Sequence, residues 1–283
     1  MAVTVSSKGS LKKYRINFFG FPYSGKTTCL GSFQDEGIIH IVNCPGEKGT
    51  ESISEGENVK SYIFSYELED SNVSLTDSFN LTKDILNSFN TVTRDIMKGA
   101  YGKVNMLAFD GLLRLQEYFL DYATEGKYLR GLEFDTRRCY PRASSLFTNF
   151  LGEIYHSNIP IVVTTTWAKY DFAEENMSET QQTQITRQGG KKLWPNLIGK
   201  MSHQILGEFN ASIYCGFEMF TQCASCKVAQ AKGEAIEKEE HRIWQLNPKG
   251  DVLGVGIKDS NKSKIYPTYI HQDWKILKAL LNS

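Results

Sequence analysis

The clearest chemical signal lies near the start of the chain, where residues 20–27 read GFPYSGKT and match the phosphate-binding pattern G-x-x-x-x-G-K-[ST]. Gly20 and Gly25 would let the backbone curl so that successive N–H groups point at a polyanion. Lys26 would neutralise the β- and γ-phosphates, and the Thr27 hydroxyl would bind Mg²⁺. The alternative is a Gly-rich turn that only begins a helix. The pattern predicts a nucleotide site formed by Gly20, Phe21, Pro22, Tyr23, Ser24, Gly25, Lys26, Thr27 and Thr28.

An acidic partner for the metal ion is expected on a neighbouring strand, because such sites hold Mg²⁺ between a hydroxyl and a carboxylate. Asp110 follows the apolar run 104–109, where a strand would deliver it. We therefore predict that Thr27 and Asp110 are the metal ligands. An Asp between a strand and a helix can also be only a helix N-cap, and this alternative stays open here.

Alternating strands and helices are needed to bring these residues to one edge of a sheet. Apolar runs predict strands at 16–19, 37–42, 59–65, 104–109 and 159–166, and helical spacing predicts helices at 77–97 and 146–155. This order is typical of an α/β fold with a mostly parallel central sheet flanked by helices. Later runs at 212–217, 242–246 and 253–257 have no long helices between them, so they predict antiparallel C-terminal additions.

The composition is that of an ordinary globular protein. Of 283 residues, 41% are hydrophobic and 23% charged, which excludes intrinsic disorder. Lys plus Arg equals Asp plus Glu at 32 each, so binding to a polyanion must come from local patches. Residues 1–13 are polar and predict a flexible tail, and 14–283 predict a single domain. The chain has no apolar segment of membrane-spanning length and no signal-peptide pattern, so we expect no membrane partner and a cytoplasmic location.

Several collinear segments from residue 14 onward resemble the RecA-like P-loop ATPases, in particular phage-encoded ATPases related to the Sak-type single-strand-annealing proteins. The resembling segments are GFPYSGKTT at 20–28, IIHIVNCPGE at 38–47, VNMLAFDGLLRL at 104–115, IPIVVTTTWAK at 159–169, LWPNLIGKM at 193–201 and VGIKDSNKSKIYP at 255–267. The resemblance implies ATP with Mg²⁺, and subunits that form rings or filaments. It also implies single-stranded DNA as the partner, in recombination, replication or repair within a bacterial or phage-infected cytoplasm.

Two positions depart from the family pattern. RecA-like ATPases usually have a water-activating Glu at the end of the second strand, where this chain has Pro45. Glu47 is the candidate substitute, because a carboxylate near the γ-phosphate can deprotonate water; a solvated loop acid is the equal alternative. The usual polar sensor at the end of the 159–166 strand is replaced by Thr165, Thr166 and Trp167. We therefore expect slow hydrolysis.

Two other functions remain open at this point. The stretch 43–46 is one residue from the D-x-P-G of GTPases, and 168–171 is one residue from the guanine-reading N-K-x-D, which suggests a GTP-binding switch. In both stretches the mismatch falls on the residue that does the chemistry. The missing Glu suggests a non-hydrolysing protein that binds nucleotide to hold an assembly together.

Two segments are candidates for single-stranded DNA. Residues 126–142 contain five basic and two acidic residues among aromatics, and 180–207 contain four basic residues and no acid. Ordinary solvated loops are the alternative.

Lys258 is the candidate for a cation supplied to the catalytic site of a neighbouring subunit, since it follows a short apolar run late in the chain. An exposed hairpin lysine is the alternative. Cys223 and Cys226 form half of a zinc pattern, and free thiols are the simpler interpretation.

Overall fold

The structure is a computed structural model that describes residues 13–47, 58–64, 74–171, 192–198, 208–219, 231–233, 240–249, 252, 254–258 and 264–282. Residues 1–12 of the predicted tail lie outside these ranges. The strands are β1 (Tyr14–Gly20), β2 (Ile39–Asn43), β3 (Val59–Tyr62), β4 (Met106–Asp110), β5 (Ile161–Asp171), β6 (Lys192–Pro195), β7 (Ala211–Met219), β8 (Glu240–Gln245), β9 (Gly256–Ile257) and β10 (Tyr269–His271). The helices are α1 (Lys26–Leu30), the 3-10 helix η1 (Gly31–Glu36), α2 (Leu75–Met97), α3 (Leu112–Ala123), α4 (Thr136–His156) and α8 (Trp274–Asn282).

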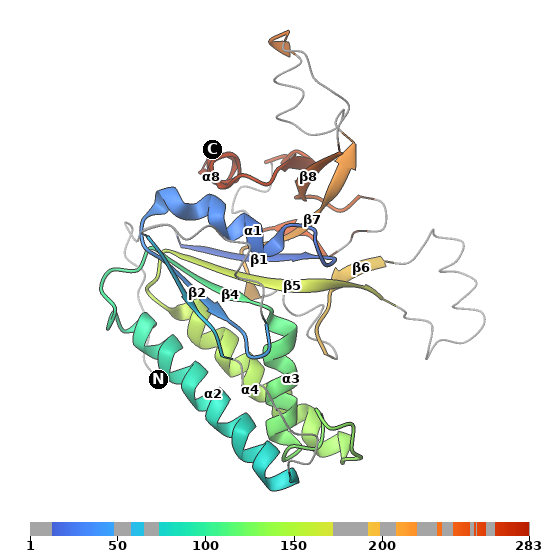
Figure 1. Cartoon of the computed structure of the whole chain (residues 1–283). Coiled ribbons are helices and arrows are strands. Elements are labelled where there is room, and N and C mark those ends of the chain that lie inside the picture. Colours follow the sequence, from blue (N-terminus) through green and yellow to red (C-terminus); the bar gives the residue numbers. More distant parts are fainter. Residues whose placement is uncertain are drawn as a thin grey trace, which may run out of the picture.

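Within the described residues, the strands form one mixed sheet in the order β10-β8-β7-β1-β5-β4-β2-β3, with β6 paired to β5 and β9 to β7. Figure 1 labels the part of this order from β8 to β2. The pairs from β7 to β3 are all parallel. The prediction of an α/β fold with a mostly parallel sheet flanked by helices is confirmed. In addition, β8 pairs antiparallel with β7, and β10 pairs antiparallel with β8, as expected for C-terminal additions.

The prediction for 212–217 is wrong in direction, because β7 runs parallel to β1, with Ile16 beside Ala211 and Phe19 beside Tyr214. The pattern of buried residues along a strand is the same in either direction. Direction depends on the path of the chain between strands, which the apolar run does not encode.

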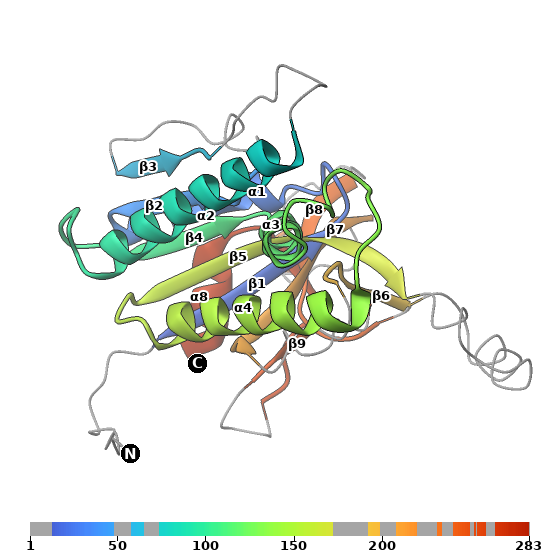
Figure 2. The same ribbon diagram turned by 90° about the horizontal axis from the view of Figure 1, so that it is seen from below.

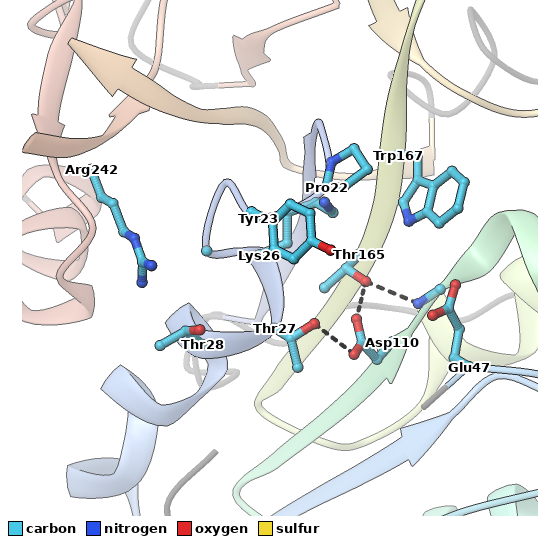
Figure 3. A pocket seen from close by; sticks show the side chains of 12 residues that line it. Pro22, Tyr23, Lys26, Thr27, Thr28, Glu47, Asp110, Thr165, Trp167 and Arg242 are labelled. Atoms are coloured by element: carbon cyan, nitrogen blue, oxygen red, sulfur yellow. Dashed lines mark hydrogen bonds between the residues drawn. The ribbon is translucent and has the colours of Figure 1, made fainter. Parts of the chain in front are cut away.

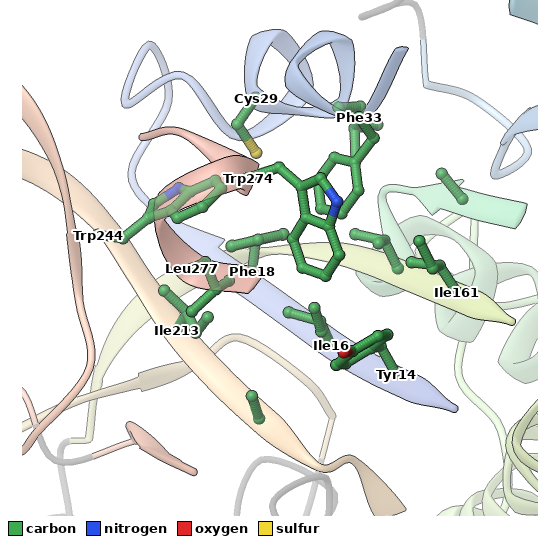
Figure 4. Packing of buried hydrophobic residues seen from close by; sticks show 14 of the residues in the cluster. Tyr14, Ile16, Phe18, Cys29, Phe33, Ile161, Ile213, Trp244, Trp274 and Leu277 are labelled. Atoms are coloured by element: carbon green, nitrogen blue, oxygen red, sulfur yellow. The ribbon is translucent and has the colours of Figure 1, made fainter. Parts of the chain in front are cut away.

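Two apolar layers cover the sheet. On β4, Met106 and Ala108 face one layer and Leu107 and Phe109 face the other, since successive side chains of a strand point to opposite faces. The first layer packs under α1, η1 and α8, where Trp274 stacks on Phe33 at 4.5 Å between ring centroids (Figure 4). The second packs under α2, α3 and α4, which lie together over one face (Figure 2). This double burial holds the ends of the central strands in fixed positions.

Helices α2 and α4 each begin at a residue whose side chain caps the first turn. The Ser74 hydroxyl accepts a hydrogen bond from the backbone N–H of Asp77 at 3.1 Å, so α2 begins close to its predicted start. Helix α4 starts earlier than predicted, because Asp135 accepts hydrogen bonds from the N–H groups of Arg137 and Arg138. The candidate DNA segment 126–142 is therefore partly loop and partly the first turns of α4. No helix in the described ranges combines the length and apolarity needed to cross a bilayer.

Candidate functional site

The phosphate-binding pattern forms a tight loop between β1 and α1. Gly25 has a left-handed backbone (φ 85°), which an L side chain rarely adopts. A Cβ at Gly25 would lie 2.6 Å from Oε1 of Gln272, and one at Gly20 would lie 2.4 Å from the carbonyl oxygen of Cys215. Gly20 is thus required by the close approach of the backbone, and Gly25 by its left-handed conformation.

This loop borders an open pocket of about 460 Å³ at the carboxyl ends of β1, β4 and β5 (Figure 3). Parallel sheets commonly bind ligands at this edge. From the predicted loop, the lining residues are Pro22, Tyr23, Gly25, Lys26, Thr27 and Thr28. The other lining residues are Glu47, Asp110, Gly111, Thr165, Trp167 and Arg242. Gly20, Phe21 and Ser24 are not among them.

Lys26 lies buried at the pocket wall, and its Nζ donates a hydrogen bond to the carbonyl oxygen of Phe21 at 2.7 Å. Burial lowers the pKa of Lys26, while the nearby carboxylates of Asp110 and Glu47 oppose this shift. An anionic ligand in the pocket would favour the charged ammonium further. The side chain is therefore placed to bind an anion.

Asp110, at the end of β4, is joined to the loop by its carboxylate. Oδ2 accepts a hydrogen bond from the Thr27 hydroxyl at 2.8 Å, and Oδ1 accepts one from the Thr165 hydroxyl. Gly111, not Asp110, is the N-cap residue of α3. The helix-cap alternative for Asp110 is therefore wrong. Burial raises the pKa of Asp110, and the two hydroxyls oppose the rise by stabilising the carboxylate.

Thr165 holds this arrangement from β5. Besides donating to Asp110, its hydroxyl oxygen accepts a hydrogen bond from the backbone N–H of Gly111 at 2.9 Å. Thr166, on the opposite face of the strand, donates to the carbonyl oxygen of Asn196 at 3.1 Å. Strand alternation thus selects Thr165 as the residue that positions Asp110.

Glu47 lines the pocket beside Asp110 and packs on Gly111. Gly111 has a left-handed backbone (φ 88°), and a Cβ there would lie 2.1 Å from Cγ of Glu47. Both the backbone conformation and the space taken by Glu47 therefore favour glycine at this position. The backbone N–H of Cys44 donates to the carbonyl oxygen of Asp110 at 2.8 Å, which holds the exit of β2 against β4. Burial raises the pKa of Glu47 to about 7, and the charge of Asp110 adds to the rise.

No protein-family model and no curated protein matches this chain. The chemistry of the site therefore rests on the residues that line it. Among the described residues, no group of three or more His, Cys, Asp or Glu side chains is arranged to hold a metal ion. The pair Thr27 and Asp110 remains the candidate for Mg²⁺, whose other ligands would be water and phosphate oxygens.

Arg242 is a pocket residue that sequence reasoning missed. It lies on β8, which pairs with β7 and β10, and its side chain reaches the loop from that side (Figure 3). The sequence shows it only as the first residue of the apolar run 242–246. No local pattern could have linked it to the phosphate-binding loop.

Lys258 does not line the pocket of its own chain. Its backbone N–H donates to the carbonyl oxygen of Asn210 at 2.7 Å, and the N–H of Asn210 donates to that of Arg15 at 2.8 Å. These residues lie at the amino end of β1, whereas the loop follows its carboxyl end. The predicted role of Lys258 in a neighbouring subunit stays a prediction.

The segment 126–142 lies at the end of the helical layer away from the sheet (Figure 1). Its exposed residues include the basic Arg130, Arg137, Arg138 and Arg142 and the apolar Leu129, Leu132 and Tyr140. Of the second candidate, 180–207, only 192–198 is described, and Cys223 and Cys226 lie outside the described residues.

Proposed function

We propose that this protein is a Mg²⁺-dependent, RecA-like ATPase that acts with single-stranded DNA in phage or bacterial recombination, replication or repair. The observation that supports it best is the hydrogen bond of 2.8 Å between Thr27 and Asp110, inside the pocket that the phosphate-binding loop borders. These two residues were predicted separately as metal ligands and are 83 positions apart. Their proximity supports a shared magnesium site.

The oxygen atoms at this place suit Mg²⁺, which prefers hydroxyl, carboxylate, water and phosphate oxygens. When bound, the ion supplies charge neutralisation and orientation of the phosphates. Thr27 and Asp110 would hold it, and Thr165 would keep the Asp110 carboxylate turned toward Thr27. A cation beside Asp110 would also offset the cost of burying its charge.

The chain's own residues would carry the remaining steps. Lys26 would exchange its hydrogen bond with the Phe21 carbonyl for one with a phosphate oxygen. Glu47, with a pKa near 7, would accept a proton from the attacking water at neutral pH. Thr165 is already hydrogen-bonded to Asp110 and Gly111, so its hydroxyl is not available as a polar sensor of the γ-phosphate, which favours slow turnover.

Two observations favour ATP over GTP. The stretch 168–171 lies within β5, where Ala168 and Lys169 pair with Pro195 and Trp194 of β6, instead of in a loop beside the pocket. The side-chain amide of Asn43 donates to Ser61 and to the carbonyl oxygen of Tyr62, away from the phosphate-binding loop. These two placements weigh against the GTP-binding alternative.

The exposed basic and aromatic side chains of 126–142 support a DNA surface, because cations bind phosphates and aromatic rings stack on unpaired bases. Reversing Arg137 and Arg138 to Glu should weaken binding of single-stranded DNA at low salt. The matched control reverses Lys98 and Lys103, two exposed cations at the other end of α2, and should leave DNA binding nearly unchanged. Equal losses in both variants would indicate nonspecific charge effects.

The experiment that tests the proposal is the turnover of ATP and GTP by the purified protein, with and without single-stranded DNA. ATP turnover stimulated by DNA is expected, and Lys26→Ala should abolish tight nucleotide binding or turnover while the fold is kept, as circular dichroism would verify. Binding restricted to GTP would indicate a switch protein. Tight ATP binding with no turnover would indicate an assembly role, and unchanged turnover in Lys26→Ala would exclude the P-loop mechanism.

A further inference from the structure

Arg242 comes from the antiparallel part of the sheet, yet its side chain lines the pocket. A Cβ at Gly25 would lie 3.2 Å from Cδ of Arg242, so the guanidinium group extends from directly beside the loop. The residue is exposed, and no carboxylate in the described ranges forms an ion pair with it. Within these ranges, its charge is therefore not used in an ion pair.

The pocket has two chemically different ends (Figure 3). Glu47 and Asp110 lie at one end, and Arg242 lies at the other, on the side of Thr28. A P-loop backbone cradles the α- and β-phosphates, its Lys reaches the β- and γ-phosphates, and its Thr binds Mg²⁺. The acidic end, with Thr27 hydrogen-bonded to Asp110, is therefore the γ-phosphate end. The Arg242 end must take the α-phosphate side of the nucleotide.

The position of Arg242 is maintained by contacts of the strands around it. Nε2 of Gln272, just after β10, donates to the carbonyl oxygen of Ser24 in the loop at 2.9 Å and to that of Ile243 at 3.2 Å. The residue next to Arg242 is thus tied to the loop through one side chain. A guanidinium that extends from this strand can bind phosphate oxygens in a bidentate manner, which an ammonium cannot.

We propose that Arg242 is a nucleotide-binding residue that contacts the α-phosphate side of a nucleoside di- or triphosphate in its own chain. This inference rests on the proposed function of the pocket. It makes the C-terminal strands part of the nucleotide site. The two cations then bind different parts of the nucleotide: Lys26 binds the β- and γ-phosphates, and Arg242 binds the α-phosphate side.

The test is calorimetric titration of the full-length protein with ATP, ADP and AMP. Arg242→Ala should lower the affinity for ATP and the affinity for ADP by the same factor, about 10- to 100-fold, as expected for loss of hydrogen bonds to a charged group. Arg242→Lys should recover only part of that loss. Lys98→Ala, an exposed cation remote from the pocket, is the control and should bind like the wild type. Any measurable AMP binding should also depend on Arg242.

If Arg242→Ala lowers the affinity for ATP but leaves the affinity for ADP unchanged, Arg242 contacts the γ-phosphate and the inference is overturned. Wild-type binding that is lost in Lys26→Ala but unchanged in Arg242→Ala would overturn the role of Arg242 and leave the proposed function standing. A wild-type protein that binds none of the three nucleotides would overturn both.

Discussion

Asp110 is a buried carboxylate whose oxygens accept hydrogen bonds from two threonine hydroxyls. Asp110→Asn keeps the shape but removes the charge that Mg²⁺ would neutralise. We expect ATP turnover to fall and to recover partly as the Mg²⁺ concentration is raised, because a weaker site can still be filled. Turnover measured across a Mg²⁺ titration checks this. A variant that behaves like the wild type at every Mg²⁺ concentration would remove Asp110 from the metal site.

Glu47 has a pKa raised to about 7 by burial, so below that pH its carboxyl group holds a proton and cannot accept one from water. We therefore expect kcat/KM, which reports the pKa values of the free enzyme, to rise with pH through about 7 and then level off. Glu47→Gln should lower turnover by roughly 10² to 10⁴ and remove this step from the pH profile.

A matched control for Glu47 is Glu117→Gln. Glu117 lies nearby, pairs with Arg114 at 2.8 Å and does not line the pocket. This variant should keep the wild-type turnover and the step in the pH profile. The midpoint of the step should move to slightly lower pH, because the negative charge of Glu117 no longer raises the pKa of Glu47. If Glu47→Gln hydrolyses ATP at the wild-type rate, Glu47 is a surface acid.

At the scale of elements, the phosphate-binding loop is held by the segment just after β10, near the other end of the chain. Gln272 bridges Ser24 and Ile243 through Nε2, and its Oε1 lies where a Gly25 side chain would be. Gln272→Ala should weaken nucleotide binding several-fold and lower the free energy of unfolding by about 1 kcal/mol per lost hydrogen bond. Nucleotide titration and urea unfolding measure the two effects.

Lys275→Ala is the control for Gln272, because it removes only an exposed ion pair with Asp35 from the neighbouring helix α8. Such pairs contribute little, so affinity and stability should stay near wild type. Wild-type affinity in Gln272→Ala would show that the loop keeps its shape without this side-chain contact.

At the scale of the whole molecule, Lys258 and the pocket lie at opposite ends of β1. Arg15, whose carbonyl is linked to Lys258 through Asn210, is separated from Gly20 by roughly 17 Å at about 3.3 Å per strand residue. Lys258 can therefore serve a pocket only in a neighbouring subunit packed head to tail. That type of contact generates rings or filaments, as the family resemblance implies.

If Lys258 acts in a neighbouring subunit, Lys258→Ala should bind ATP without hydrolysing it. Mixing it with Lys26→Ala subunits should restore some turnover, at sites that pair an intact P-loop with an intact Lys258. Mixed oligomers would be verified by differently tagged subunits. A mixture that forms such oligomers and stays as inactive as its components would leave Lys258 an ordinary exposed lysine.

The sequence by itself determined the parts of the site that a short stretch of chain encodes. The loop conformation depends on Gly20 and Gly25 within one strand-to-helix turn, and Asp110 follows a short apolar run that predicts a buried strand. The α/β alternation was readable for the same reason, since burial on both faces of a parallel strand leaves an apolar run.

The tertiary structure alone decided which distant residues meet at that loop. Thr165 reaches Asp110 because β5 lies beside β4, and Arg242 and Gln272 reach Gly25 because β8 and β10 extend the sheet beyond β7. Glu47 could be named as a candidate, but its place in the pocket depends on Gly111 having no side chain. These contacts follow from strand order and direction, which are set by packing of the whole chain and leave no periodic trace in any one segment.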